Sequence, residues 1–203
     1  IMELDSNKKI IRFQEKPKRE EAFSKLINAG AYALEYEILS YIPSGRFVSM
    51  EREIFPKVLD KNMYGYEFKG YWLDTGRPVD YINAHKILLE NIQRDIGKST
   101  IYKNANISSH ITIGNSCVID GVVKPYSCLG DNIVTGKNSE ISESVIMGDV
   151  KIGSDTKILH SVIGEKCVIG KNVSLKNVVL GDRCVIHDNI SLLDAKIDPN
   201  EER

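Results

Sequence analysis

The C-terminal half of the chain repeats itself every 17 residues between positions 129 and 192. Within each period, apolar anchor positions are separated by steps of 6, 6 and 5 residues. Three short apolar anchors per repeat are typical of a triangular coil whose flat sides are strands. The anchors, eleven of them aliphatic, are Leu129, Ile146, Ile163 and Leu180, then Thr135, Ile152, Ile169 and Ile186, and finally Ile141, Ile158, Leu175 and Leu192.

The position four residues after each anchor is also small or aliphatic, and we expect it to point inward like the anchor. Between these positions lie mostly Gly, Asp, Asn, Lys and Ser, which accept tight corners. The pattern predicts a left-handed parallel β-helix of hexapeptide repeats over residues 97–203, with about five coils between 107 and 192. The inward set comprises Ile133, Val150, Cys167 and Cys184, then Ser139, Thr156, Val173 and Ile190, and lastly Val145, Val162 and Val179.

Residues 1–96 have a different texture, with more aromatic residues and helical periods, and we predict a separate α/β unit there. Ser49 is a suitable N-cap for a helix that Pro56 should bend. A second helix should begin at Pro78 and end near Gly97. The predicted strands span residues 10–13, 28–34 and 65–73.

Composition excludes several classes of protein. The net charge is -1 and the basic residues are dispersed, which argues against a nucleic-acid partner. The sequence contains no apolar run long enough to cross a membrane and opens with no charged-then-apolar leader, so we expect a cytoplasmic protein without a membrane partner. We interpret Cys117, Cys128, Cys167 and Cys184 as packed free thiols, with a structural metal or disulfide as the alternative.

Four short motifs occur in a fixed order ahead of the repeats. They are Glu-Lys-Pro at 15–17, Ile-Asn-Ala-Gly-Ala-Tyr at 27–32, Ser-Met-Glu-Arg-Glu-Ile-Phe-Pro at 49–56 and Gly-Tyr-Trp-Leu-Asp-Thr-Gly-Arg-Pro at 70–78. In order and approximate spacing, with a hexapeptide β-helix behind them, they resemble the sugar-1-phosphate nucleotidyltransferases, and among these most closely the mannose-1-phosphate guanylyltransferases. The resemblance covers essentially the whole chain.

That resemblance implies transfer of a nucleotide from a nucleoside triphosphate to a sugar 1-phosphate, with pyrophosphate leaving and Mg²⁺ as cofactor. The family's Gly-rich triphosphate loop and first metal-binding Asp have no counterpart in this sequence, which begins at Ile1. We therefore expect residues 1–96 to be the C-terminal, sugar-phosphate-binding part of a catalytic domain whose nucleotide half has been removed or belongs to another chain. Such a chain should be inactive alone.

Individual roles also follow from the resemblance. Asp74 would be one of two aspartates that hold Mg²⁺ and, with Lys16, would form the catalytic pair. Lys16 would contact the sugar phosphate and Glu15 would accept hydrogen bonds from sugar hydroxyls. Asn28 and the backbone at Gly30 would close on the sugar ring.

Each of these residues also has a purely structural interpretation. Asp74 begins an Asp-Thr-Gly turn at a strand end, and Glu15 with Lys16 resembles a solvated turn pair. Trp72 should pack as core beneath the site, and His85 should be a satisfied core histidine on the apolar helix face. His160 and His187 should occupy corners of the β-helix.

Three alternative functions remain open. The first is a glucose-1-phosphate nucleotidyltransferase using UTP, dTTP or ATP. The second is a hexapeptide acyltransferase, which needs a projecting loop and a histidine base; the irregular step from Ile119 to Leu129 is too short for such a loop. The third is a non-catalytic regulatory or assembly subunit. In every case we expect the β-helix to hold the preceding helix and to mediate homo-oligomerisation, because open sheet edges are usually capped or paired.

Overall fold

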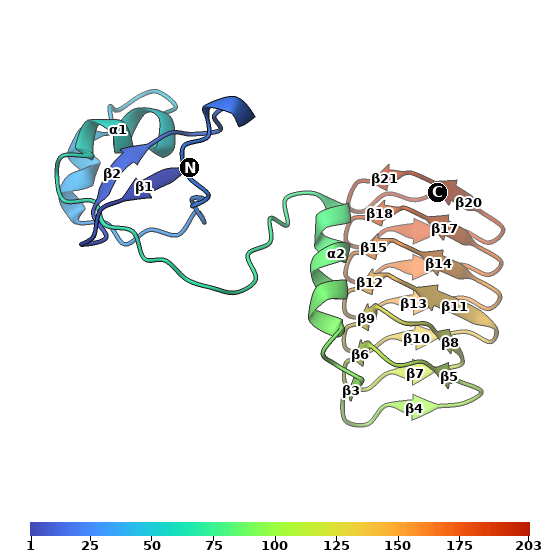
Figure 1. The fold of residues 1–203 in the computed structure, drawn as a ribbon. Coiled ribbons are helices and arrows are strands. Elements are labelled where there is room, and N and C mark those ends of the chain that lie inside the picture. The colour runs from blue at the N-terminus through green and yellow to red at the C-terminus, as the bar shows by residue number, and fades with distance from the viewer. The chain divides into compact units, whose positions relative to one another are not determined.

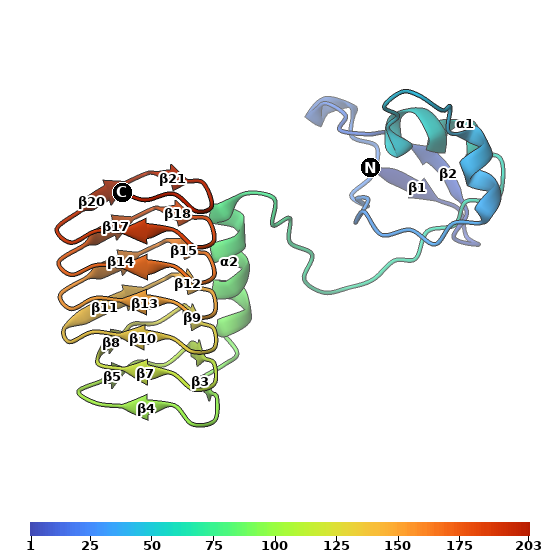
Figure 2. The same cartoon turned by 180° about the vertical axis from the view of Figure 1, so that it is seen from behind.

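The computed structural model describes residues 1–203, and the chain divides into two compact units, Ile1–Trp72 and Leu73–Arg203. Figures 1 and 2 show the two units from opposite sides, and each is described below by itself. The structural division falls earlier than the predicted boundary at residue 96. The helix Pro78–Leu89 packs against the β-helix and therefore belongs to the second unit.

The first unit contains a short antiparallel pair and several helical turns. Strand β1 (Met2–Leu4) pairs with β2 (Ile10–Phe13), which confirms the first predicted strand. A turn at Glu15 and Lys16 follows, and Pro17 lacks the N–H that a continuing strand would need. Two 3₁₀ segments, Arg19–Glu21 and Tyr36–Tyr41, lie in the connections.

Ser49 caps the helical segment, as predicted. Its hydroxyl oxygen accepts a hydrogen bond from the backbone N–H of Arg52 at 3.2 Å. The first turn, Met50–Ile54, is a π-helix, and the α-helix α1 (Phe55–Val58) continues it. Pro56 therefore lies in the first turn of α1, where a missing N–H is tolerated. Ile54 and Phe55 are almost fully buried and form the small core of this unit.

The predictions of strands at 28–34 and 65–73 were wrong. Residues 28–34 form loop and bend, and in the second segment Gly65 donates its N–H to the Lys8 carbonyl without a continuing ladder. A strand persists only where a neighbouring strand satisfies its backbone groups, and no strand lies beside either segment. The apolar composition of a segment therefore does not by itself predict a strand.

The second unit is a parallel β-helix, as predicted. It has six coils, one more than the sequence predicted. Its three flat sides are three parallel sheets, which we call faces A, B and C. Face A, seven-stranded, consists of β3 (Arg94–Ile96), β6 (Ile111–Ile113), β9 (Ser127–Leu129), β12 (Val145–Ile146), β15 (Val162–Ile163), β18 (Val179–Leu180) and β21 (Lys196–Ile197).

The other two faces have six strands each. Face B consists of β4 (Ile101–Tyr102), β7 (Val118–Ile119), β10 (Val134–Thr135), β13 (Lys151–Ile152), β16 (Val168–Ile169) and β19 (Val185–Ile186). Face C consists of β5 (Asn106–Ile107), β8 (Gly121–Val123), β11 (Ser139–Ser142), β14 (Lys157–Leu159), β17 (Ser174–Lys176) and β20 (Ser191–Leu193).

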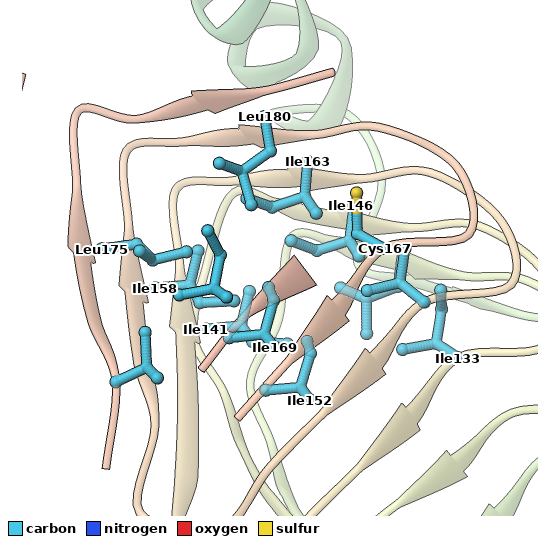
Figure 3. Packing of buried hydrophobic residues seen from close by; sticks show 14 of the residues in the cluster. Ile133, Ile141, Ile146, Ile152, Ile158, Ile163, Cys167, Ile169, Leu175 and Leu180 are labelled. Carbon is cyan, nitrogen blue, oxygen red and sulfur yellow. The ribbon is translucent and has the colours of Figure 1, made fainter. Parts of the chain in front are cut away.

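The anchors stack in the interior at the predicted 17-residue register, and Figure 3 shows this packing. Eleven of the twelve anchors are no more than 4% exposed, and Leu192 in the last coil is half-buried. Thr135, the polar anchor, accepts a hydrogen bond from the N–H of Asp120 at 2.9 Å. Ile169 pairs with Ile152 and Ile186 in the neighbouring coils.

One of the three predicted inward columns is wrong. Val145, Val162 and Val179 lie in the outward row of face A, and the interior positions are Ser144, Ser161 and Val178. The five-residue step is the cause, because it shortens this side by one residue and brings the residue three after the anchor inward. The two buried serines are satisfied by backbone partners: Ser144 Oγ donates to Ser142 O, and Ser161 Oγ donates to Leu159 O.

The cysteines are free thiols, as predicted, but they occupy two environments. Cys117, Cys167 and Cys184 are fully buried in the coil interior. Burial raises the pKa of the Cys167 thiol to about 11. Cys128 instead points outward on face A and is half-buried.

Helix α2 (Pro78–Leu89) packs along face A, as Figures 1 and 2 show. The Leu89 carbonyl accepts a hydrogen bond from His110 Nδ1 at 3.1 Å, and Lys86 forms an ion pair with Glu143 at 3.3 Å. The helix ends earlier than the predicted Gly97, because β3 already begins the first coil at Arg94. The expectation that the β-helix holds the preceding helix is confirmed.

Candidate functional site

The turn after β2 carries two of the predicted site residues. Glu15 and Lys16 line an open pocket of about 330 Å³ together with Glu51, Arg52 and Pro56. Lys16 has a φ of 44°, a left-handed conformation that side-chain-bearing residues adopt rarely. The same left-handed backbone recurs at the corners of the β-helix, so this φ defines the turn at Lys16 and is not by itself a sign of function.

The two side chains at this turn differ in exposure. The Lys16 side chain is 80% exposed and that of Glu15 is 24% exposed. Their charged groups lie 3.9 Å apart, too far for a strong hydrogen-bonded pair. The Lys16 ammonium group is therefore available to an anion in solution.

Asn28 and Gly30 form the second part of the site. The Asn28 side-chain oxygen accepts a hydrogen bond from the Gly30 N–H at 2.9 Å, and Gly30 has a φ of 75°. The amide group of Asn28 donates to the hydroxyl of Tyr32. These contacts fix the orientation of the Asn28 side chain within the loop.

Tyr32 connects this loop to the pocket. Its hydroxyl donates to Glu51 Oε1 at 3.0 Å, and Ser49 Oγ donates to Glu51 Oε2 at 3.2 Å. The Tyr32 ring packs edge-on against Phe55 at 4.9 Å, which holds the hydroxyl in place. The structure thus joins the motifs at 27–32 and 49–56 through one hydrogen-bond chain.

The electrostatics of this chain keep Glu51 ionised. Its own backbone N–H, with smaller contributions from Tyr32 and Ser49, lowers the pKa of the Glu51 carboxyl. Burial raises the pKa of Tyr32, and the nearby carboxylates of Glu51 and Glu15 add to that effect. The pocket lining therefore carries two cationic side chains, Lys16 and Arg52, and two carboxylates, Glu15 and Glu51.

Trp72 does not pack as the buried residue that the sequence predicted. It is 44% exposed, and its indole N–H donates to the Ala29 carbonyl at 3.0 Å. Trp72 therefore ties the motif at 70–78 to the loop that carries Asn28. The core beneath the pocket is formed instead by Phe55 and Ile54.

Asp74 belongs to the second unit, whereas the pocket at Glu15 and Lys16 belongs to the first. Its Oδ1 accepts a hydrogen bond from the Gly76 N–H at 3.0 Å, which is the turn that the structural interpretation expected. The other carboxylate oxygen has no hydrogen-bond donor within the chain. The structure contains no group of three or more His, Cys, Asp or Glu side chains arranged around a common metal position.

Sequence reasoning missed the roles of Tyr32 and Glu51. Both residues lie within motifs that the sequence analysis identified, at 27–32 and 49–56, but no role was predicted for either side chain. The sequence does offer one signal for Glu51: it lies two residues after the N-cap Ser49 at the start of a helix, where the two side chains can form a hydrogen bond. The hydrogen bond to Tyr32 itself, across 19 residues, appears only in the folded chain.

The histidines have structural partners. His160 lies at a corner with φ 49° and pairs with Asn177, and His187 pairs with Glu202. His85 lies between α2 and face A, where its ring Nδ1 is 2.9 Å from the Tyr81 carbonyl. The irregular step from Ile119 to Leu129 contains β8 and a corner, so no loop projects from the coil there.

Comparison with known proteins defines the class. Residues 1–91 match the family model described as Nucleotidyl transferase, and residues 95–202 match the GMPPB C-terminal domain. The chain belongs to the sugar-1-phosphate nucleotidyltransferase family.

The relatives carry more than one name. The chain is 34% identical to the mannose-1-phosphate guanylyltransferase of Mycobacterium tuberculosis, with 68% of this chain and 36% of the relative covered. It is 31% identical to the bifunctional protein GlmU of Methanocaldococcus jannaschii, with 75% and 43% covered. It is also 31% identical to the UTP–glucose-1-phosphate uridylyltransferase of Synechocystis, with 72% and 42% covered. The chain thus spans less than half the length of these relatives.

No helix of the structure is both long enough and apolar enough to span a bilayer.

Proposed function

We propose that this chain takes part in nucleotidyl transfer from a nucleoside triphosphate to a sugar 1-phosphate, with GTP and mannose 1-phosphate as the substrates. The observation that carries the proposal is the hydrogen-bond chain from Asn28 through Tyr32 to Glu51, which ends in the pocket lined by Glu15 and Lys16. Three of the four motifs of the family resemblance meet around this chain and the pocket.

The pocket has the chemical groups that a sugar 1-phosphate needs. The exposed ammonium group of Lys16 would pair with the phosphate, because a cation forms strong charge-assisted hydrogen bonds with phosphate oxygens. Glu15 and Glu51 would accept hydrogen bonds from sugar hydroxyls. Asn28 would bind the sugar ring, and the bare backbone at Gly30 would allow the ring to approach closely.

Phosphoryl transfer of this kind depends mainly on positioning and charge. Lys16 would hold the sugar phosphate and offset its charge while the attacking phosphate oxygen approaches the α-phosphorus of the triphosphate. Glu15 and Glu51 would fix the sugar in one orientation, which lowers the entropic part of the barrier.

Asp74 is the candidate ligand for Mg²⁺. One carboxylate oxygen is held by Gly76 while the other has no donor within the chain, and a carboxylate oxygen is a ligand that Mg²⁺ accepts. A site with one protein carboxylate fits this ion, because Mg²⁺ keeps several waters and takes its other ligands from phosphates. When bound, the ion would supply neutralisation of phosphate charge.

We propose that the nucleotide is bound by a further part of the catalytic domain. Residues 1–72 contain no Gly-rich turn between a strand and a helix, the usual cradle of a triphosphate. The same unit exposes Tyr36, Phe47 and Tyr66 by more than 80%. Exposure of several large aromatic side chains in one small unit favours a surface that another part of the protein covers.

A glucose-1-phosphate nucleotidyltransferase is the second candidate, because relatives under that name match over a similar share of the chain. The hexapeptide acyltransferase is less favoured, since no loop projects at the irregular coil and His160 and His187 are paired at corners. A non-catalytic assembly subunit would leave the charged pocket without a role.

Binding of sugar phosphates to the 203-residue chain tests the proposal. Calorimetry should show mannose 1-phosphate binding, weakened at least about tenfold by Lys16→Met. Glu15→Gln should reduce the preference for mannose 1-phosphate over glucose 1-phosphate while retaining phosphate affinity. Lys18→Met, two residues away and also exposed, serves as the matched control. Equal losses for Lys16→Met and Lys18→Met would place the sugar-phosphate site elsewhere.

A further inference from the structure

Helix α2 and face A enclose a group of polar side chains that the proposed nucleotidyl transfer does not use (Figure 1). Cys128 lies in the outward row of face A, where Thr112 and Val145 are its neighbours in the adjacent coils. His85 on α2 forms a hydrogen bond with the side chain of Cys128. Three elements, β6, β9 and α2, therefore bring a hydroxyl, a thiol and an imidazole together.

Tyr81, one helical turn before His85, fixes the orientation of the imidazole. Nδ1 of His85 lies 2.9 Å from the Tyr81 carbonyl oxygen, and the two rings pack edge-on with their centroids 4.4 Å apart. A carbonyl oxygen can only accept a hydrogen bond, so Nδ1 carries a proton. Nε2 is therefore the nitrogen that faces the sulfur of Cys128.

The sulfur of Cys128 accepts hydrogen bonds from two directions. Thr112 Oγ1 donates to Cys128 Sγ at 2.9 Å, and His85 contributes the second hydrogen bond. Burial raises the pKa of the Cys128 thiol, but these two hydrogen bonds and the charge of His85 outweigh burial and lower it. The hydrogen bond with Cys128 raises the pKa of His85 in turn, against the effect of burial. Both directions favour a thiolate beside an imidazolium.

The three interior cysteines provide a comparison within the same chain. Cys117, Cys167 and Cys184 are 0% exposed, and burial raises the pKa of the first two. The sulfur of each lies within hydrogen-bond distance of a backbone carbonyl oxygen, which favours the protonated thiol. Cys128 combines partial exposure with a neighbouring imidazole, which none of the interior cysteines does.

We propose that Cys128 is a site of oxidation by hydroperoxides, that His85 donates the proton that the leaving oxygen takes up, and that this oxidation loosens α2 from face A. The thiolate attacks the terminal oxygen of the hydroperoxide, so that an S–O bond forms and the O–O bond breaks. The sulfur loses two electrons and becomes a sulfenic acid. The second oxygen leaves as hydroxide or alkoxide, takes the proton from Nε2 of His85, and departs as water or an alcohol.

The oxidised side chain no longer suits the contact that holds α2. A sulfenic acid is neutral, so the charge-assisted hydrogen bond between His85 and the thiolate is lost. The added oxygen also needs room beneath the helix, where Val145, the next residue of the outward row, is only 3% exposed. Since a helix of twelve residues is marginal by itself, α2 depends on its contact with the β-helix.

The release should be greatest in the first half of α2. The two other polar contacts of α2 with the β-helix involve Lys86 and Leu89, nearer the C-terminal end of the helix. Three residues separate Pro78, the first residue of α2, from Asp74. A link from oxidation to catalysis rests on the proposed role of Asp74 as a metal ligand, whereas oxidation and helix release are independent of it and are measured without turnover.

Trapping of the sulfenic acid tests the modification site. The 203-residue chain is treated with hydrogen peroxide and dimedone, and mass spectrometry resolves the adduct at each cysteine. At pH 7, Cys128 should be labelled more than about tenfold faster than Cys117, Cys167 or Cys184.

His85→Gln tests the role of the imidazole, because glutamine keeps a hydrogen-bond donor but provides neither the charge nor the proton. The variant should slow labelling of Cys128 more than about fivefold at pH 7. The difference should shrink above the ordinary thiol pKa of about 8.5, whereas a merely displaced helix would change the rate at every pH. His160→Gln, at a corner of the β-helix, is the matched control and should label at the wild-type rate.

Hydrogen exchange of the α2 amides tests the release. Peroxide should speed exchange in Pro78–Leu89 of the wild-type chain but not of Cys128→Ser, and a thiol reductant should reverse the effect. The interior strands should keep their protection, because the coils remain intact. Equal labelling of the four cysteines, wild-type labelling of His85→Gln at pH 7, or unchanged exchange of α2 after oxidation of Cys128 would each overturn the proposal.

Discussion

The hydroxyl of Tyr32 and the carboxylate of Glu51 are joined by a hydrogen bond of 3.0 Å that links two sequence motifs 19 residues apart. The Asn28 amide donates to the same hydroxyl, and Ser49 donates to the other carboxylate oxygen. The loop that would bind the sugar ring and the pocket that would bind its phosphate are thereby fixed relative to one another within the first unit.

Tyr32→Phe should disconnect the loop from the pocket. Loss of its hydroxyl should destabilise the first unit by about 0.5 to 1.5 kcal/mol and weaken sugar-phosphate binding. The pKa of Glu51 is lowered in the folded chain by its own backbone N–H and by Tyr32, so its stabilising contribution is present at neutral pH and is lost as pH falls through that lowered pKa.

In Tyr32→Phe the Glu51 pKa should therefore rise toward its ordinary value, and the acid-induced loss of stability should begin at a higher pH. Carboxyl titration by carbon NMR measures the shift directly. Tyr36→Phe, whose ring is highly exposed, is the control. An unchanged Glu51 titration in Tyr32→Phe would show that the hydrogen bond has no electrostatic effect.

Ile169→Asp should open the β-helix. The side chain is 2% exposed and its neighbours in the stack, Ile152 and Ile186, offer no partner for a charge. A buried, unpaired carboxylate should lower the free energy of unfolding by more than about 3 kcal/mol. Thermal and denaturant unfolding measure the effect.

The matched control for this variant is Ser174→Asp, which adds the same charge at an exposed outward position of face C. It should leave the unfolding transition nearly unchanged. Equal unfolding midpoints for the two variants would mean that the register of the coil is misassigned.

Cys128 should be the most reactive thiol of the chain. Burial raises its pKa, but hydrogen bonds with His85 and Thr112 and the charge of His85 outweigh burial, so the pKa lies below its usual value. Cys167, with a pKa of about 11, should react far more slowly at neutral pH. Alkylation followed by mass spectrometry resolves the individual cysteines.

His85→Ala should slow alkylation of Cys128 at pH 7, because less thiolate is then present. The difference should shrink above the ordinary thiol pKa, where both chains hold the thiolate form. A chain that carries both His85→Ala and Cys128→Ser gives the background alkylation rate of the remaining cysteines. Equal rates of Cys128 alkylation at pH 7 in the wild-type chain and in His85→Ala would exclude the hydrogen bond between His85 and Cys128.

Much of this architecture could be predicted from the sequence, for a physical reason. In a β-helix each coil packs on its neighbours, so a 17-residue repeat contains the register of the whole stack. Val145, Val162 and Val179 were predicted to point inward, but the five-residue step turns them outward on face A, the face against which α2 packs (Figure 1). That contact joins segments whose sequence patterns are independent.

The first unit was harder to predict. Residues 28–34 and 65–73 are apolar enough for strands, but strand formation depends on a partner that local composition does not reveal. The motif residues Glu15, Lys16, Asn28 and Gly30 were identified through resemblance, whereas the hydrogen bond between Tyr32 and Glu51 depends on the folded arrangement.

Asp74→Asn, made in a chain that also carries the proposed nucleotide-binding part, should abolish turnover and leave folding intact. The substitution keeps the side-chain oxygen that accepts from Gly76 but removes the negative charge proposed to hold Mg²⁺. The loss should amount to several kcal/mol of transition-state stabilisation, roughly a thousandfold in rate or more. Asp80→Asn, in the first turn of α2, is the control. Near-normal turnover of Asp74→Asn at limiting Mg²⁺ would rule out the metal assignment.

Pyrophosphate release tests the central claim most directly. Residues 1–203 should release no pyrophosphate from GTP and mannose 1-phosphate in the presence of Mg²⁺, because the triphosphate lacks its cradle of backbone amides. The β-helix of the same sample should still unfold cooperatively, and a chain extended by a Gly-rich nucleotide-binding segment should release pyrophosphate under identical conditions. Robust release by residues 1–203 alone would contradict the account.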